Sequence, residues 1–175
     1  KDETSCAVVY LREPRELMIC TGPPYQKGQD EEFATRVKEF TGKKIVMGAT
    51  TGDIIARELN LEVVDGQEFA DPDLPPLSFL DGIDLFTEGI LTLRKVESLL
   101  EKYNNNYKLG RGPADQVVKL ILESDEIRFL IGTRINIAHQ APTMHVDLEI
   151  RRTVVKRIAY LLEENFLKKV IINYL

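Results

Sequence analysis

Cysteine is nearly absent from this chain: Cys6 and Cys20 are the only two among 175 residues, and they do not form a CxxC motif. Metal-binding or redox use of the thiols is therefore not expected, and both are interpreted as small buried groups in a reducing compartment. No apolar run approaches the roughly 20 residues of a membrane-spanning helix. No basic-then-apolar signal segment opens the sequence. These absences predict a cytoplasmic protein with no membrane partner.

An excess of positive charge is also missing, since the net charge is −5 and the pI is near 5.2. Binding to duplex nucleic acid normally needs a basic face, so no nucleic-acid partner is expected. One late helical segment is locally basic, and its charges are interpreted as a solvated helix face. These charges are Arg151, Arg152, Lys156 and Arg157. The length and the 43% hydrophobic content suit one globular domain with a substantial core.

The motifs of common enzyme classes are missing too. The sequence contains no GxGxxG and no GxxxxGK[ST], so no specific nucleotide is predicted. No GxSxG supplies a serine nucleophile, and neither cysteine has the electropositive, exposed setting of a reactive thiol. We expect no cofactor and no complete catalytic apparatus in this chain.

Strands that alternate with amphipathic helices are what the sequence does contain. The apolar patterns predict strands, short extended pieces over residues 77–86, a loop over residues 65–76, and helices. The expected strands cover residues 6–11, 17–20, 44–47, 62–64, 127–131 and 170–174, and the expected helices cover 29–40, 52–59, 93–103, a segment that opens at Pro113, and 147–165. This alternation predicts an α/β fold, a mainly parallel sheet with helices on both faces, as in a Rossmann-like three-layer sandwich.

Small or polar residues follow several predicted strands, at residues 21–22, 48–52, 87–89 and 132–136. The carboxyl ends of parallel strands share one edge of the sheet, where ligands bind in such folds. The turn at 48–52 is the sharpest signal, because its glycines leave the first amides of the following helix uncovered. We expect Gly48, Thr50, Thr51 and Gly52 to hold a phosphate or carboxylate. The alternative is that Thr50 or Thr51 only caps the helix.

The other strand ends supply further candidate ligand-binding residues. Glu88 could bind a hydroxyl group or act as a base, although its favoured interpretation is to complement the positive end of the next helix. Arg134 could clamp an anion. His139 could donate to a ligand or move a proton, or it could satisfy loop carbonyls, which is favoured modestly. Asn136 is the expected neighbour of His139 at the same edge.

The first ten residues resemble the closing strand of bacterial PPM-type serine/threonine phosphatases, the family typified by the stage II sporulation protein E. In that family an Asp-Asp or Asp-Asn pair lies one residue ahead of Thr or Ser, and its first Asp ligates the catalytic metals. Asp2 matches this position, whereas Glu3 departs from the pattern. The resemblance implies that residues 1–12 are the last strand of a truncated phosphatase domain. Manganese or magnesium would bind Asp2 only in the intact parent.

Later segments look like an extension found after the phosphatase domain in some bacterial members. They are residues 12–15, 21–24, 48–51, 82–93 and 136–140. With the start on Lys1 rather than methionine, this implies a piece of a longer protein, with residues 13–175 as a single C-terminal α/β domain. No catalytic residue of the family can be transferred to that domain, so we expect the fragment to lack phosphatase activity.

Three functional hypotheses follow. The leading one is a non-catalytic regulatory or ligand-sensing domain that binds a small anionic metabolite or nucleotide and acts on its own upstream phosphatase domain. The second is a ligand-free interaction module that forms a homodimer through residues 6–11. The third is a small Rossmann-like enzyme that uses Glu88 or His139 as a base.

Overall fold

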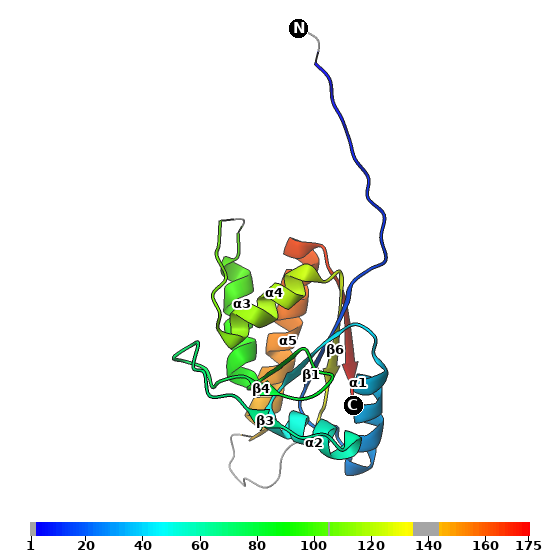
Figure 1. Ribbon diagram of the computed structural model, residues 1–175, viewed down its shortest axis with the longest axis vertical. Helices are drawn as coiled ribbons and strands as arrows, with labels where there is room; N and C mark the ends of the chain where they lie inside the picture. Colours follow the sequence, from blue (N-terminus) through cyan, green and yellow to red (C-terminus); the bar gives the residue numbers. More distant parts are fainter. Residues whose placement is uncertain (1–2, 105, 135–143) are drawn as a thin grey trace.

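The computed structural model describes residues 3–104, 106–134 and 144–175 (Figure 1). Within these ranges the chain forms a mixed, mostly parallel seven-stranded sheet in the order β3-β4-β5-β2-β1-β6-β7. Five strands run in one direction: β1 (Glu16–Thr21), β2 (Lys43–Met47), β5 (Leu85–Thr87), β6 (Glu126–Ile131) and β7 (Lys169–Tyr174). The short strands β3 (Val64–Asp65) and β4 (Ser78–Phe79) add an antiparallel edge. The expected α/β class with a mainly parallel sheet is confirmed.

Helices cover both faces of this sheet. A 3-10 turn, η1 (Lys27–Gln29), leads into α1 (Asp30–Glu39), which lies with α2 (Ala49–Leu59) on one face. The opposite face carries α3 (Ile90–Lys102), α4 (Pro113–Glu123) and α5 (Met144–Phe166). Each helix buries the apolar stripe that its sequence spacing indicates. Among the described residues, no helix combines the length and apolarity needed to cross a bilayer.

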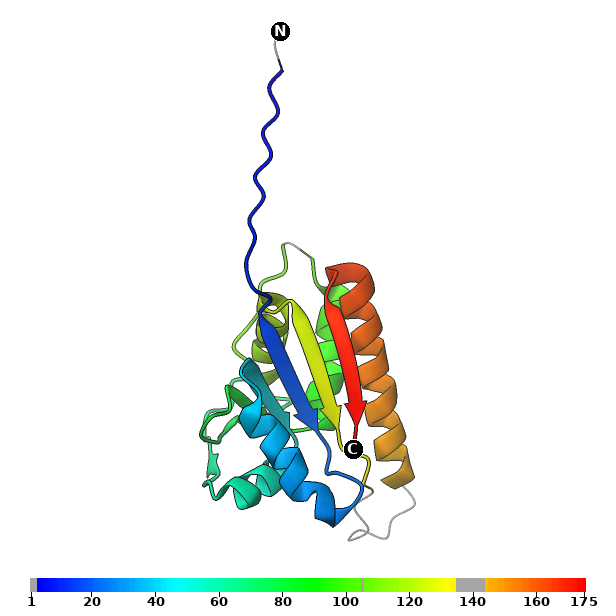
Figure 2. The same cartoon turned by 90° about the vertical axis from the view of Figure 1, so that its right-hand side faces the viewer.

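The order of the strands reverses at β1. The chain runs from β1 to β2 and later to β5 on one side of it, and then returns to the other side of β1 as β6 and β7. Figure 2 shows β1, β6 and β7 side by side with their arrows pointing the same way. A parallel sheet has its ligand crevice at such a switch point, beyond the carboxyl ends of the strands.

The expected strand at residues 6–11 does not form, which corrects the sequence interpretation. Residues 3–15 belong to no helix or strand, and Val8, Tyr10 and Leu11 are between 81% and 89% exposed. The segment leads away from the amino ends of the strands (Figures 1 and 2). The residue types favour a strand, but a strand forms only where a neighbouring backbone completes its hydrogen bonds.

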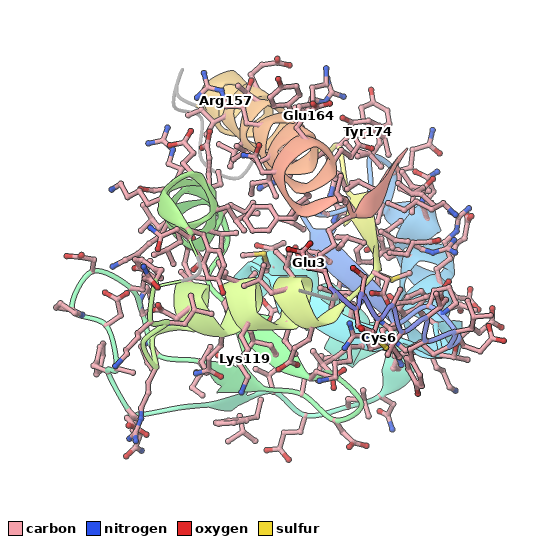
Figure 3. The ribbon with its side chains drawn as sticks, turned by 90° about the horizontal axis from the view of Figure 1, so that it is seen from above. Glu3, Cys6, Lys119, Arg157, Glu164 and Tyr174 are labelled. Atoms are coloured by element: carbon pink, nitrogen blue, oxygen red, sulfur yellow. The ribbon has the colours of Figure 1, made fainter. Side chains whose placement is uncertain are left out.

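The two cysteines have different environments. Cys20 is completely buried in β1, as expected, and burial raises the pKa of its thiol. Cys6 is exposed on the N-terminal segment, so its expected burial is wrong. Figure 3, seen from above, shows Cys6 and Glu3 on this segment, apart from Arg157 and Glu164 on α5.

Two arginines fasten the N-terminal segment to the domain. Arg12 binds the Asp125 carboxylate through both terminal guanidinium nitrogens, and the Arg15 amide donates to Asp125 Oδ2 at 2.8 Å. The hydrogen bonds from Arg12 and Arg15 hold the pKa of Asp125 far below its usual range. Because Arg15 and Asp125 immediately precede β1 and β6, these contacts fix the starts of the two strands at the switch point.

Helix α2 begins at Ala49, three residues earlier than the sequence predicts. Gly48 is its N-cap residue, so Thr50, Thr51 and Gly52 belong to the first turns of the helix. Gly52 brings α2 close to β5: a Cβ atom at this position would lie 2.0 Å from Cζ of Phe86.

Replacing Gly52 with alanine should therefore destabilise the domain. Alanine normally stabilises a helix interior by about 1 kcal/mol relative to glycine, but here its methyl group would overlap the buried Phe86 ring. We expect Gly52→Ala to lower the free energy of unfolding by about 1–3 kcal/mol, measured by urea denaturation. Gly28→Ala is the control, because nothing lies within 4 Å of the added Cβ. Equal stability of the two variants would contradict this packing.

Candidate anion-binding site

Loops from four strand ends meet around one pocket of about 270 Å³ at the carboxyl edge of the sheet. The loop after β1 contributes Gly22 and Pro23, and the loop after β6 contributes Arg134. The walls from β2 and β5 are residues 47–51 and 88–90, and α5 adds Leu148 and Arg151. The structure thus brings together the strand ends that the sequence predicts to share an edge. We call this hollow the anion pocket.

The N-terminus of α2 forms one wall of the anion pocket. Gly48 adopts φ 113° and ψ 131°, and its amide donates to Thr87 O at 2.8 Å. No side chain caps the helix, and the first turn closes through bonds from the Thr51 and Gly52 amides to Gly48 O, both at 3.1 Å. The amides of Ala49 and Thr50 precede these donors, at the end of the helix that carries partial positive charge.

Thr51 joins two loops of the pocket instead of capping its helix, which corrects the capping alternative. Its side chain is buried, and its Oγ1 accepts a hydrogen bond from the Gly22 amide at 2.9 Å. A hydroxyl group that accepts one bond still has a proton to donate. Thr51 therefore fixes the β1 loop against α2 and also presents a donor at the pocket wall.

Glu88 lies at the pocket wall, but part of its carboxylate is already engaged. Oε2 accepts hydrogen bonds from the amides of Leu91 and Thr92 at 3.0 and 3.2 Å. These amides lie in the first turn of α3, so the favoured interpretation of Glu88 as the complement of a helix N-terminus is confirmed. The α3 terminus offsets the charge of Glu88, so an anion in the pocket meets less repulsion than from an unpaired carboxylate.

Arg134 enters the pocket from the loop after β6. Its amide donates to Pro23 O at 3.0 Å, which fixes its backbone beside the β1 loop. Its Nη1 lies 3.6 Å from Oδ1 of Asp30, the first residue of α1, and only 20% of the Arg134 side chain is exposed. Arg134 thus lines the pocket while its side chain makes a buried ionic contact.

Arg151 of α5 lies over the β1 loop, a position that the sequence analysis missed. A Cβ atom on Gly22 would lie 2.7 Å from Nη1 of Arg151, so the guanidinium packs directly on the glycine. Arg151 and Arg152 are half-buried, and Arg152 lies over the Tyr174 ring at 5.5 Å. The prediction that the basic residues of this helix are all solvated is therefore wrong. Their spacing could not reveal it, because the loop contact depends on tertiary packing.

Four predicted residues are not found at the pocket wall among the described residues. Gly52 does not line the pocket and packs instead against Phe86. Asn136, His139 and Asp2 lie outside the described residues. Within residues 3–104, 106–134 and 144–175, no group of three or more His, Cys, Asp or Glu side chains is arranged to hold a metal ion.

The structure has a larger hollow at the opposite edge of the sheet. It measures about 730 Å³ and lies where the N-terminal segment joins the domain, between residues 13–16 and 41–43. Two of its wall residues, Lys43 and Glu123, lie 3.6 Å apart as an ion pair. Since it faces the amino ends of the strands, it lacks the convergent helix N-termini that distinguish the anion pocket.

Comparison with known proteins identifies no relative. No family model matches the chain, and no curated protein or solved structure matches it either. The likeness of the first ten residues to the closing strand of the phosphatases therefore stays a prediction. Function has to be inferred from the geometry of the pocket.

Removing the Thr51 hydroxyl should loosen the pocket wall. In Thr51→Val the buried Gly22 amide loses its acceptor, so we expect the free energy of unfolding to fall by about 1–3 kcal/mol, with faster hydrogen exchange at the Gly22 amide. Thr51→Ser keeps the acceptor and is the control. If the serine and valine variants have the same stability and the same Gly22 exchange, Thr51 does not tie the loops together.

Proposed function

We propose that this domain binds a small anionic metabolite in the anion pocket and serves as a ligand-sensing regulatory unit. The observation that carries the proposal is the convergence of four strand-end loops on one pocket, with an uncapped helix N-terminus and two arginines in its wall. Helix N-termini bind anions through free amides and through the dipole. Arginine adds a planar fork of donors that matches a phosphate or carboxylate.

The charge of the pocket differs from that of the whole chain. The protein carries a net charge of −5, whereas the pocket wall contains Arg134, Arg151 and the uncapped positive end of α2. The one carboxylate at the wall, Glu88, is hydrogen-bonded to the α3 terminus. These groups at the wall support an anionic ligand, such as a phosphate monoester, over a neutral one.

The volume of the pocket limits the size of the bound group. At about 270 Å³ it is smaller than the roughly 300–1,000 Å³ of most small-molecule sites. It therefore suits a phosphorylated or carboxylated metabolite of few carbons, or the phosphate end of a nucleotide. The second oxygen of Glu88 would accept a hydrogen bond from a ligand hydroxyl, which favours a sugar or polyol phosphate.

The wider setting in this proposal is a bacterial metal-dependent serine/threonine phosphatase of the stage II sporulation protein E type, in the cytoplasm. Residues 13–175 would be its C-terminal Rossmann-like domain, and residues 1–12 would be the last strand of the preceding phosphatase domain. The exposure of the apolar side chains at residues 8–11 supports this, because such a strand would be buried in its parent sheet. Asp2 would hold manganese or magnesium only there.

Binding of inorganic phosphate tests the proposed function. The substitution Ala49→Pro tests whether the phosphate binds at the N-terminus of α2. We expect phosphate to raise the melting temperature of the wild type at millimolar concentration. Ala49→Pro removes one amide donor, and proline is accommodated at the first position of a helix. A hydrogen bond to a charged group contributes about 1.5–3 kcal/mol, so we expect phosphate affinity, measured by calorimetry, to fall at least tenfold.

Ala49→Ser keeps the amide and is the matched control. Chloride at equal ionic strength controls for screening of the net negative charge, and a panel of sugar phosphates, carboxylates and nucleotides ranks the ligands. If no compound stabilises the wild type at near-millimolar levels, the sensor proposal fails. If phosphate binds equally well to Ala49→Pro, the ligand lies elsewhere.

The exposed N-terminal segment favours a second candidate function, self-association. Val8, Val9, Tyr10 and Leu11 form a continuous apolar stretch with 81–89% exposure, which suits pairing with a second copy. In that case light scattering should give twice the monomer mass of 19.9 kDa, and deletion of residues 1–11 should return the monomer. An association state that does not change on deletion would exclude this segment as the interface.

A further inference from the structure

We infer that Asp30, which lies outside the anion pocket, is a positioning residue that holds Arg134 at the pocket wall. The inference rests on the proposed function, because it assigns the recognition of the anion to Arg134. Asp30 itself is not among the residues that line the pocket. It therefore acts on a ligand only through the arginine.

Asp30 is a buried carboxylate between two cations. Its side chain is 4% exposed, Oδ2 accepts a hydrogen bond from Nη2 of Arg57 at 2.6 Å, and Oδ1 lies 3.6 Å from Nη1 of Arg134. Burial of a carboxylate is costly unless cations compensate it, and two cations lie beside this one. The chain thus holds a charge in the interior immediately behind the pocket arginine.

The contact steers Arg134 without consuming its donors. Among the described residues, neither Asp30 Oδ1 nor Arg134 Nη1 has a hydrogen-bond partner, so the two groups attract each other as ions and not as a bidentate pair. A guanidinium has five N–H donors. Its remaining donors can face an anion on the pocket side while the carboxylate restricts its rotamers.

The Asp30 carboxylate also reduces the positive potential that Arg134 offers to an anion. The distances decide whether this reduction or the positioning of Arg134 dominates. Arg57 lies 1.0 Å closer to Asp30 than Arg134 does, at 2.6 Å against 3.6 Å. Arg57, which also pairs with Glu58 at 2.7 Å, therefore offsets part of the negative charge of Asp30, and a ligand would lie beyond the Arg134 guanidinium. The repulsion between the Asp30 carboxylate and a bound anion is thereby reduced, whereas Asp30 still restricts the position of the Arg134 side chain. Removal of the Asp30 charge should consequently weaken binding.

A double-mutant cycle tests this role with inorganic phosphate as the probe. We expect Asp30→Asn to weaken phosphate binding about tenfold and Arg134→Ala to weaken it at least as much. The double variant should bind no more weakly than Arg134→Ala alone, because Asp30 acts through the missing side chain. Glu32→Gln, which removes an exposed carboxylate paired with Arg36 on the same helix, is the matched control and should leave affinity unchanged.

Positioning is separated from folding by a second variant and a second readout. Asp30→Glu keeps the charge and should retain part of the affinity that Asp30→Asn loses, and it replaces Asp30→Asn in the cycle if the asparagine variant does not fold. The side-chain Nε–Hε NMR signal of Arg134 should move in Asp30→Asn but not in Glu32→Gln. Each variant is compared at a temperature where circular dichroism shows it folded.

The outcomes distinguish a failure of the proposed function from a failure of the inference about Asp30. No phosphate binding by the wild type overturns the proposed function and this inference with it. Phosphate binding by the wild type, together with unchanged or tighter binding by Asp30→Asn, overturns the inference alone. An equal loss from Asp30→Asn in the presence and absence of Arg134 also overturns it, because Asp30 would then act independently.

Discussion

The in-register pairing of the parallel strands is the constraint on which the rest of this structure depends. Thr21 at the end of β1 is paired with Met47 of β2 and with Ile131 of β6, and Met47 is paired with Thr87 of β5. Four chain segments far apart in sequence therefore end in one row. The loops that follow these strand ends therefore start close to one another, and the backbone hydrogen bonds of the sheet maintain that arrangement.

Close backbone approach then turns this row of ends into a pocket. Gly48 and Gly22 both have positive φ, at 113° and 80°, where a larger residue would be strained. A Cβ on Gly89 would lie 3.4 Å from Gly48 Cα, so the starts of α2 and α3 nearly touch. Two helices begin side by side on one hollow; Glu88 complements the terminus of α3, whereas the terminus of α2 has no side-chain cap. The uncapped end of α2 therefore faces the hollow close to Arg134.

The sequence was sufficient for the features that depend on local periodicity and turn chemistry. The apolar runs predict the main strands of the sheet, and the glycines of residues 48–52 predict a strand-to-helix turn at the pocket wall, although the helix begins at Ala49 and not at Gly52. Glu88 is recognisable because a carboxylate ahead of an amphipathic run commonly complements a helix. These inferences need only neighbours within a few residues.

Features that depend on distant contacts were not accessible in this way. Arg151 resembles any charged residue on a helix surface until α5 is packed beside Gly22. Asp30 has no signal at all, because its partners Arg57 and Arg134 lie 27 and 104 residues away. Residues 6–11 show the converse, since their strand propensity is not realised where no second strand completes the ladder.

The Arg12–Asp125 fastening and the anion pocket lie at opposite ends of the same two strands, β1 and β6. A six-residue strand spans about 20 Å, so a ligand in the pocket would not touch the N-terminal segment. Strands in the middle of a sheet do not stretch. A conformational signal between the two ends would therefore not be transmitted as a shift of atoms along the strands. Under the proposed function, binding would instead change how readily these two strands separate at their far end, so that bound and empty domains would differ in local dynamics before they differ in shape.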